Sequence, residues 1–66
     1  MNKYKRIITI SPLPSSLPTL MTWDGEDGIS VRKARVGNNP REYVIEGTIA
    51  IKRRIDRLAD MFDCDD

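Results

Sequence analysis

The positions of apolar residues divide the chain into segments with different periodicity. Residues 4–10, Tyr-Lys-Arg-Ile-Ile-Thr-Ile, are rich in β-branched side chains and predict a strand. Three later segments, 19–23, 29–36 and 41–46, are short, partly apolar and separated by turn residues, so we interpret them as strands as well. Strands joined by short turns pair antiparallel, which predicts a meander of three strands with residues 4–10 as an optional fourth.

Residues 48–62 follow a different pattern, because apolar side chains recur there at intervals of three and four residues. This spacing places an apolar face along one side of a helix. The face consists of Ile51, Ile55, Leu58 and Phe62. The whole pattern therefore predicts a small α+β fold, in which an antiparallel β-meander of three or four strands is closed by one C-terminal amphipathic helix.

Glycine and proline mark the connections between these segments. Residues 24–28 contain two Asp-Gly steps, which supply the positive φ that tight hairpins need, and residues 37–40, Gly-Asn-Asn-Pro, form a second turn. Residues 11–18 contain three prolines. We interpret this segment as a proline-rich loop, because proline disrupts helix interiors and central strands.

Residues 40–47 allow a second interpretation. Asn39 and Glu42 match a capping box, which would begin a single helix over residues 40–62. Gly47 would then lie inside that helix, next to several β-branched residues that also disfavour it. We favour a strand followed by a helix.

The size of the chain sets narrow limits on its stability. Leu, Ile, Val and Phe account for 16 of the 66 residues, about 24%, which exceeds the level of roughly 20% below which chains stay disordered. We expect a single small domain over residues 1–66, with an acidic C-terminal end at 60–66. The single cysteine, Cys64, cannot form an internal disulfide, and no histidine is present to complete a zinc site. The acidic turn lacks the ligand spacing of a calcium loop, so we expect no metal and no cofactor.

Composition also narrows the class of protein. Without histidine, the usual general base at neutral pH is missing, and neither a Ser–His nor a Cys–His pair can form. We therefore expect that the protein is not an enzyme. No apolar run has the length of a signal-peptide core or a membrane span, and a lone thiol fits a reducing compartment. We expect a cytoplasmic protein that does not contact a membrane.

The charges nearly cancel, since 11 basic and 10 acidic residues give a net charge of +1, but they are segregated along the chain. Two basic clusters stand out, one in the predicted hairpin and one at the start of the predicted helix. They comprise Arg32, Lys33, Arg35 and Arg41 in the first, and Lys52, Arg53, Arg54 and Arg57 in the second. We predict that these cations contact a partner with an acidic surface; the alternative is that they form a solvated polar surface.

Three functions are compatible with these features. The first is a non-enzymatic protein-binding module, a regulator or inhibitor of the type found in viruses and mobile elements, that uses the basic hairpin and helix surfaces. The second is a small nucleic-acid-binding regulator, acting as a dimer, that uses the same cations on phosphates. The third is a structural subunit of a larger assembly.

Several apolar residues are candidates for protein contacts. The candidate interface anchors are Trp23, Leu13 and Leu17. The alternative for Trp23 is burial in the core, and the alternative for the two leucines is a loop that crosses and packs against the sheet of the same chain. The apolar face of the predicted helix is a candidate seam for a homodimer. Two antiparallel copies would set the basic start of one helix against the acidic end of the other. The alternative is that this face packs on the sheet of its own chain.

Overall fold

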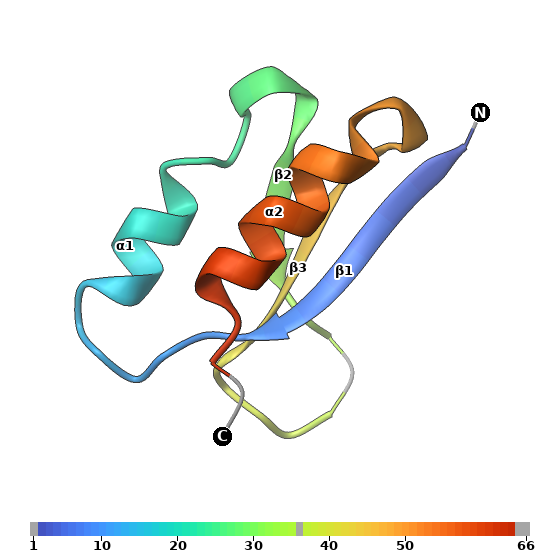
Figure 1. The fold of residues 1–66 in the computed structure, drawn as a ribbon. Helices are drawn as coiled ribbons and strands as arrows, with labels where there is room; N and C mark the ends of the chain where they lie inside the picture. Colours follow the sequence, from blue (N-terminus) through green and yellow to red (C-terminus); the bar gives the residue numbers. More distant parts are fainter. Residues whose placement is uncertain (1, 36, 65–66) are drawn as a thin grey trace.

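The computed structural model describes residues 2–35 and 37–64, and this part of the chain contains three strands, β1 (Lys3–Thr9), β2 (Ser30–Lys33) and β3 (Glu42–Thr48). Both strand pairs are antiparallel, and the order in the sheet is β1-β3-β2. One face of the sheet is covered by the C-terminal helix α2 (Lys52–Phe62), as Figure 1 shows. The predicted α+β class, an antiparallel sheet with a C-terminal helix, is confirmed.

The strand order differs from a meander of consecutive strands. β2 and β3 form the predicted hairpin around residues 37–40, while β1 pairs with the other side of β3. The single helix over residues 40–62 is wrong, because β3 is extended. Asn39 does accept a hydrogen bond from the backbone N–H of Arg41 at 2.9 Å, but the chain then continues as a strand. β2 ends at Lys33, short of the predicted range 29–36, whose Val36 lies outside the described residues.

A helix replaces the strand that we predicted over residues 19–23. This helix, α1 (Ser16–Met21), also includes the end of the predicted proline-rich loop 11–18, so the loop prediction is wrong for residues 16–18. Pro18 is the third residue of α1. An N–H in the first turn of a helix has no acceptor within the helix, so proline at this position breaks no hydrogen bond. α1 buries Leu20 completely.

The acidic turn links α1 to β2 instead of closing a hairpin. It forms a short 3₁₀ helix, η1 (Glu26–Gly28), and its two glycines have φ values of 89° and 80°, as the Asp-Gly steps predict. The side chain of Asp24 accepts a hydrogen bond from the backbone N–H of Val31 at 2.9 Å. The turn is therefore fastened to the outer edge of β2.

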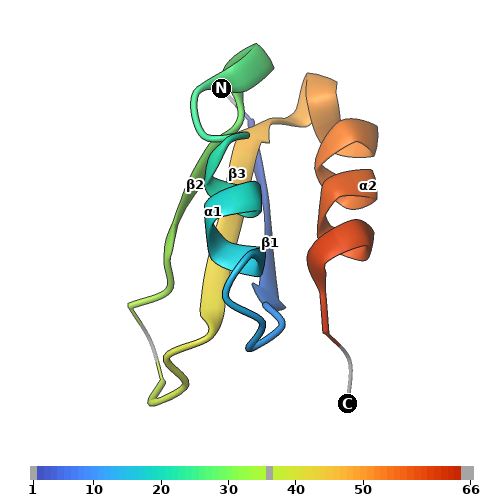
Figure 2. The ribbon, with the colours of Figure 1, turned by 90° about the vertical axis from the view of Figure 1, so that its left-hand side faces the viewer.

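The core lies between the sheet and the two helices. In Figure 2 the sheet and α2 form two layers, and α1 lies in front of the sheet in this view. The buried cluster comprises Ile8, Ile10, Leu20, Ile29, Val31, Ile45, Ile55, Leu58 and Ala59. The described residues include no helix long and apolar enough to cross a membrane. The opposite face of the sheet carries no covering element in this part of the chain (Figure 2).

Candidate interaction surfaces

Two cations of the predicted hairpin cluster and the predicted helix cluster lie on opposite sides of the sheet. Arg32 stands opposite Val44 in the β2–β3 register and lies with Arg35 beside a hollow of about 290 Å³ on the uncovered face. The helix cluster lies on α2, which covers the other face. Arg32 and Arg35 therefore lie on a different surface from the four cations of α2.

The uncovered sheet face combines apolar and basic side chains. Its hollow is lined by Lys5, Ile7, Arg32, Ala34, Arg35, Glu42 and Val44. Ile7 is 55% exposed, whereas Val44 is buried beneath its neighbours. Arg32 pairs with Glu46 at 3.5 Å, which neutralises part of this face.

The remaining hairpin cations are placed differently. Lys33 stands opposite Tyr43 in the sheet register. Because neighbouring residues of a strand point to opposite faces, Lys33 does not share the face of Arg32. Arg41 is half-buried, and its guanidinium donates a hydrogen bond to the carbonyl oxygen of Ile10 at 3.2 Å. Arg41 therefore helps to connect the hairpin to the end of β1.

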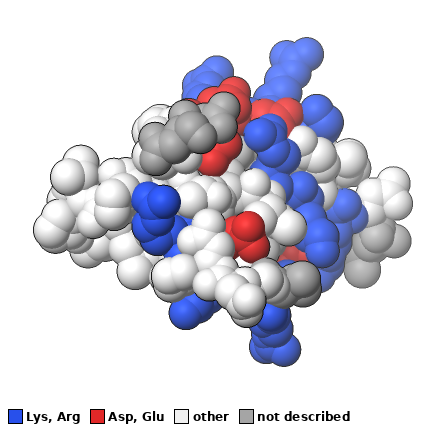
Figure 3. Space-filling model, turned by 90° about the horizontal axis from the view of Figure 1, so that it is seen from below, with Lys and Arg blue, Asp and Glu red and all other residues white. Residues whose placement is uncertain are grey.

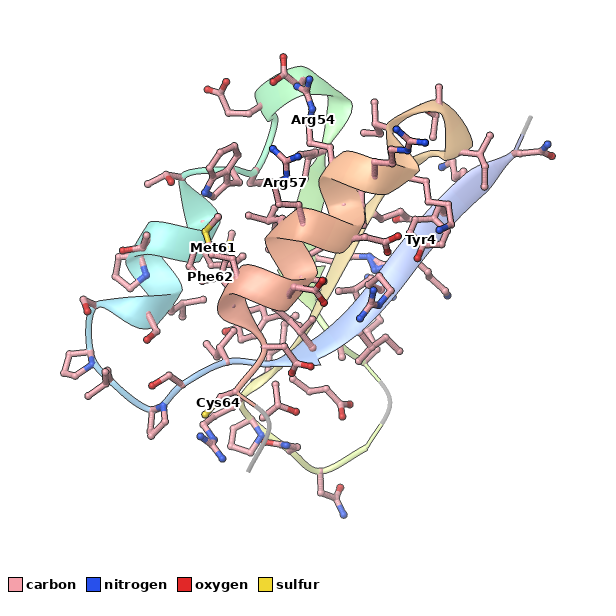
Figure 4. The ribbon with its side chains drawn as sticks, viewed as in Figure 1. Tyr4, Arg54, Arg57, Met61, Phe62 and Cys64 are labelled. Carbon is pink, nitrogen blue, oxygen red and sulfur yellow. The ribbon has the colours of Figure 1, made fainter. Side chains whose placement is uncertain are left out.

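A groove lies between α2 and the segment that follows α1. Its volume is about 270 Å³, and its lining is Trp23, Ile29, Arg54, Arg57, Leu58 and Met61. Met61 is 61% exposed, and Trp23, which lines the same groove, is half-buried. Arg54, Arg57 and Met61 project from α2 toward the side that carries α1 and η1 (Figure 4). The groove thus joins an apolar floor to two guanidinium groups.

The helix cations differ in how far they are already neutralised. Lys52 binds Asp56 at 3.0 Å and Arg54 binds Asp27, whereas Arg53 and Arg57 form no ion pair with any described residue. A shallow hollow of about 210 Å³ is lined by Arg53, Arg54 and Arg57 alone. The positive charge that remains available on α2 is therefore concentrated at Arg53 and Arg57.

Charge is distributed unevenly over the face of the molecule that is seen from below (Figure 3). Seen from below, Lys and Arg atoms form a band across the right-hand half of the molecule, which is the side of β1 in Figure 1 (Figure 3). The left-hand end, on the side of α1, is nearly free of charged atoms. This agrees with the sequence, because residues 11–23 contain no charged side chain.

A cluster around Asp56 was not found by the sequence analysis. The hydroxyl of Tyr4 donates a hydrogen bond to Asp56, and Arg6 Nη1 donates to the same carboxylate at 2.9 Å. Lys52 Nζ binds the other oxygen at 3.0 Å and lies 5.1 Å from the centre of the Tyr4 ring. Tyr4, Lys52 and Arg6 lower the pKa of Asp56 from 3.8 to about 2, and the Tyr4 hydrogen bond contributes most.

This cluster joins β1 to α2, so Lys52 has a structural partner. The sequence contained two signals for it. Lys52 and Asp56 are four residues apart, which is contact distance on a helix, and Tyr4 and Arg6 alternate with Lys5 along a strand, which places them on one face. Only the fold shows that these two faces meet.

The predicted apolar anchors have different environments. Leu13 is 64% exposed in the loop before α1, whereas Leu17 and Trp23 are half-buried and pack against the core. On α2, Ile55 and Leu58 are buried in the core of the same chain. Ile51 and Phe62 are half-buried and pack against that core. A homodimer that keeps this fold would therefore need a surface other than this seam.

Within residues 2–35 and 37–64, no three His, Cys, Asp or Glu side chains are grouped so that they could hold a metal ion. In comparisons with known proteins, the chain matches no family model, no curated protein and no solved structure. The functional argument therefore depends on the surfaces described above.

Proposed function

We propose that this protein is a non-enzymatic protein-binding module that regulates or inhibits a partner with an acidic surface. We propose that the protein acts in the cytoplasm, since a single thiol fits a reducing compartment. Its small size is typical of viral and mobile-element regulators. The single observation that carries the proposal is the groove beside α2, which combines an apolar floor with Arg54 and Arg57.

The composition of this groove suits protein recognition. Trp, Met and Arg are enriched at protein interfaces, and the residues that dominate binding energy lie in desolvated pockets. Arg57 has no ion-pair partner among the described residues, so an acidic group on the partner would not have to displace an existing one. Positive charge beside an apolar surface also steers an acidic partner toward the groove.

Charge reversal at two neighbouring arginines tests the proposal. Arg57 lines the groove, while Arg53 is equally basic and exposed but lies outside it. Tagged wild-type protein, Arg53→Glu, Arg57→Glu and Met61→Glu are used to capture proteins from the native cell, with circular dichroism as a control for folding. We expect that wild type and Arg53→Glu capture the same partner. The amount of this partner captured by the two groove variants should be lower by at least about tenfold. Capture that is equal for all four proteins contradicts the proposal.

The hollow lined by three arginines favours one alternative, a nucleic-acid-binding regulator. Such binding is dominated by phosphate contacts and weakens steeply with salt. Titration of mixed duplex and single-stranded oligonucleotides at several salt concentrations distinguishes the two functions. Contact with four to six phosphates would give a log–log slope of roughly −3 to −5, whereas a flat response removes this alternative.

A further inference from the structure

The outer edge of β1 is open over most of its length. In an antiparallel pair, residues alternately direct both backbone polar groups toward the neighbouring strand and away from it. Ile10 donates to Arg41 O at 2.8 Å, on the side of β3, so Thr9 and every second residue before it face outward. The outward groups of Thr9 are bonded to the segment after α2, with distances of 3.1 Å to Asp63 Oδ1 and 2.6 Å to Cys64 N.

The other outward-facing backbone groups of β1 are those of Lys3, Lys5 and Ile7. Within residues 2–35 and 37–64, no hydrogen bond is formed to them. β1 forms the right-hand margin of the sheet in Figure 1, and no other strand lies beyond it. This row therefore offers donors and acceptors to an added strand.

The opposite edge of the sheet is less accessible. Ala34 donates to Glu42 O at 3.0 Å, on the side of β3, so Ile29, Val31 and Lys33 face outward along β2. The acidic turn already occupies much of this edge. Asp24 accepts from Val31 N–H, and Gly25 N–H donates to Ile29 O at 2.7 Å. β1 is the better of the two edges for strand addition.

The side chains of the open row define what could bind there. Ile7 stands opposite Val44, so Lys3, Lys5 and Ile7 point to the uncovered face of the sheet. Both lysines are exposed and form no ion pair with a described residue. Glu46, the register partner of Lys5 on β3, is engaged by Arg32. The outer row thus carries two free positive charges followed by an exposed apolar side chain.

We propose that β1 binds an extended acidic segment of a partner protein as a fourth strand. Carboxylates at alternate positions of that segment lie beside Lys3 and Lys5, and an apolar side chain lies beside Ile7. Backbone hydrogen bonds along the edge provide affinity, and opposite charges on neighbouring strands favour the pairing. This surface is separate from the groove beside α2, so it does not depend on the function proposed above.

A second copy of the chain is a poorer occupant. Antiparallel pairing of two β1 strands that uses all three open residues places Lys5 directly opposite Lys5 of the second copy, and like charges in that position are unfavourable. A shift toward the end of β1 meets Thr9, whose edge is covered by Asp63. The charges on the edge therefore favour an acidic segment.

The test uses synthetic peptides about as long as β1 and the ¹⁵N-labelled protein. The first peptide has Glu at the two alternate positions that lie beside Lys3 and Lys5, Val at the alternate position that lies beside Ile7, and Val at the positions between them. The second peptide has Lys in place of Glu, and the third is the first with N-methylated amides. We expect the Glu peptide to shift the amide resonances of Lys3, Lys5 and Ile7 and to protect them from hydrogen exchange. Affinity should fall at least about tenfold for each of the other two peptides. In the variant Lys5→Glu, which leaves Lys3 as the remaining cation of the row, the preference for the Glu peptide should be lost, and in Lys3→Glu/Lys5→Glu it should reverse.

Several outcomes overturn the proposal. These are an absence of saturation at millimolar peptide, equal binding of the N-methylated peptide, or shifts centred on Arg57. Protection of β1 that grows with protein concentration in the absence of peptide would instead identify a second copy as the occupant. Arg57→Glu serves as the control, since it reverses the charge of a residue that lines the groove beside α2 and should leave binding of the Glu peptide to β1 unchanged.

Discussion

The ionisation of Asp56 depends on the fold. Its pKa is lowered to about 2, so its charged form is stabilised in the native state relative to the unfolded chain. This contribution is fully present above the unfolded pKa of 3.8 and is lost as the pH falls toward 2. The hydroxyl of Tyr4 is the largest cause of the shift, and it can be removed without changing the aromatic ring.

We therefore expect Tyr4→Phe to raise the pKa of Asp56 toward its ordinary value. The variant should also lose less of its remaining stability than wild type between pH 4 and pH 2. NMR titration of the carboxyl carbon and urea unfolding at several pH values measure both effects. Tyr43→Phe is the matched control, because the Tyr43 hydroxyl forms no hydrogen bond with any residue in 2–35 or 37–64. An unchanged pKa in Tyr4→Phe would contradict the role assigned to the hydroxyl.

Gly47 is required by close packing beneath α2. A Cβ atom at this position would lie 2.6 Å from Ile51 Cδ1, 3.1 Å from Ile55 Cδ1 and 3.2 Å from the backbone oxygen of Gly28. We expect Gly47→Ala to lower the free energy of unfolding by about 1–3 kcal/mol, as other overpacked cores do. Adding Ile51→Val removes the nearest atom and should restore part of the loss in thermal or urea unfolding. Equal stability of wild type and Gly47→Ala would show that the helix moves away at little cost.

At the level of elements, local sequence patterns predicted the segments with strong periodicity. The strand at residues 4–10 and the apolar face of α2 were correct, because β-branched runs and helical spacing both report directly on backbone conformation. In α1, residues 16–18 were predicted as part of the proline-rich loop and residues 19–21 as part of a strand, since six residues show less than two helical turns of pattern. Its burial of Leu20 against distant residues decided the outcome, and that contact has no local signal.

The first turn of α2 is electrostatically unfavourable. It contains Lys52, Arg53 and Arg54 but no acidic residue, and no side chain caps it. Positive charge at this end opposes the helix dipole, so Arg53→Glu should stabilise the protein by about 0.3–1 kcal/mol at low salt. Thermal unfolding at low and high salt measures this gain, which salt should reduce. Arg57→Glu makes the same charge change in the middle of α2 and should give a smaller gain; an equal gain would point to net charge as the cause.

At the level of the whole molecule, carboxylates cover parts of both sheet edges. Asp24 binds Val31 N–H on β2, and Asp63 binds Thr9 N–H on β1. Exposed edges invite pairing between molecules, and charged groups on an edge reduce it. Asp24→Ala should therefore lose about 1–3 kcal/mol of stability and should associate at lower concentration than wild type. Light scattering and urea unfolding report the two effects. Asp24→Asn keeps an acceptor oxygen and should lose less; losses of equal size would show that the hydrogen bond does not matter.

The candidate site could be predicted from the sequence only in part. The cations of the hairpin and of α2 were identified from their clustering, but sequence spacing does not show that α2 packs on one face of the sheet while Arg32 points to the other. Trp23 and Met61 are far apart in the chain, but both line the groove beside α2. Whether β1 has an open edge depends on which strand lies in the centre of the sheet. β3 is the central strand, because β1 pairs with the side of β3 that β2 leaves open.

The separation of the two basic surfaces has a consequence for stoichiometry. The molecule measures 19 Å along its shortest axis, so bodies docked on its two faces would be held apart by one thin layer of protein. A single copy that engages both faces becomes a bivalent linker. The amount of ternary complex, in which one copy holds a partner on each face, is then greatest at intermediate concentrations of this protein. An excess of the protein gives binary complexes with one partner each.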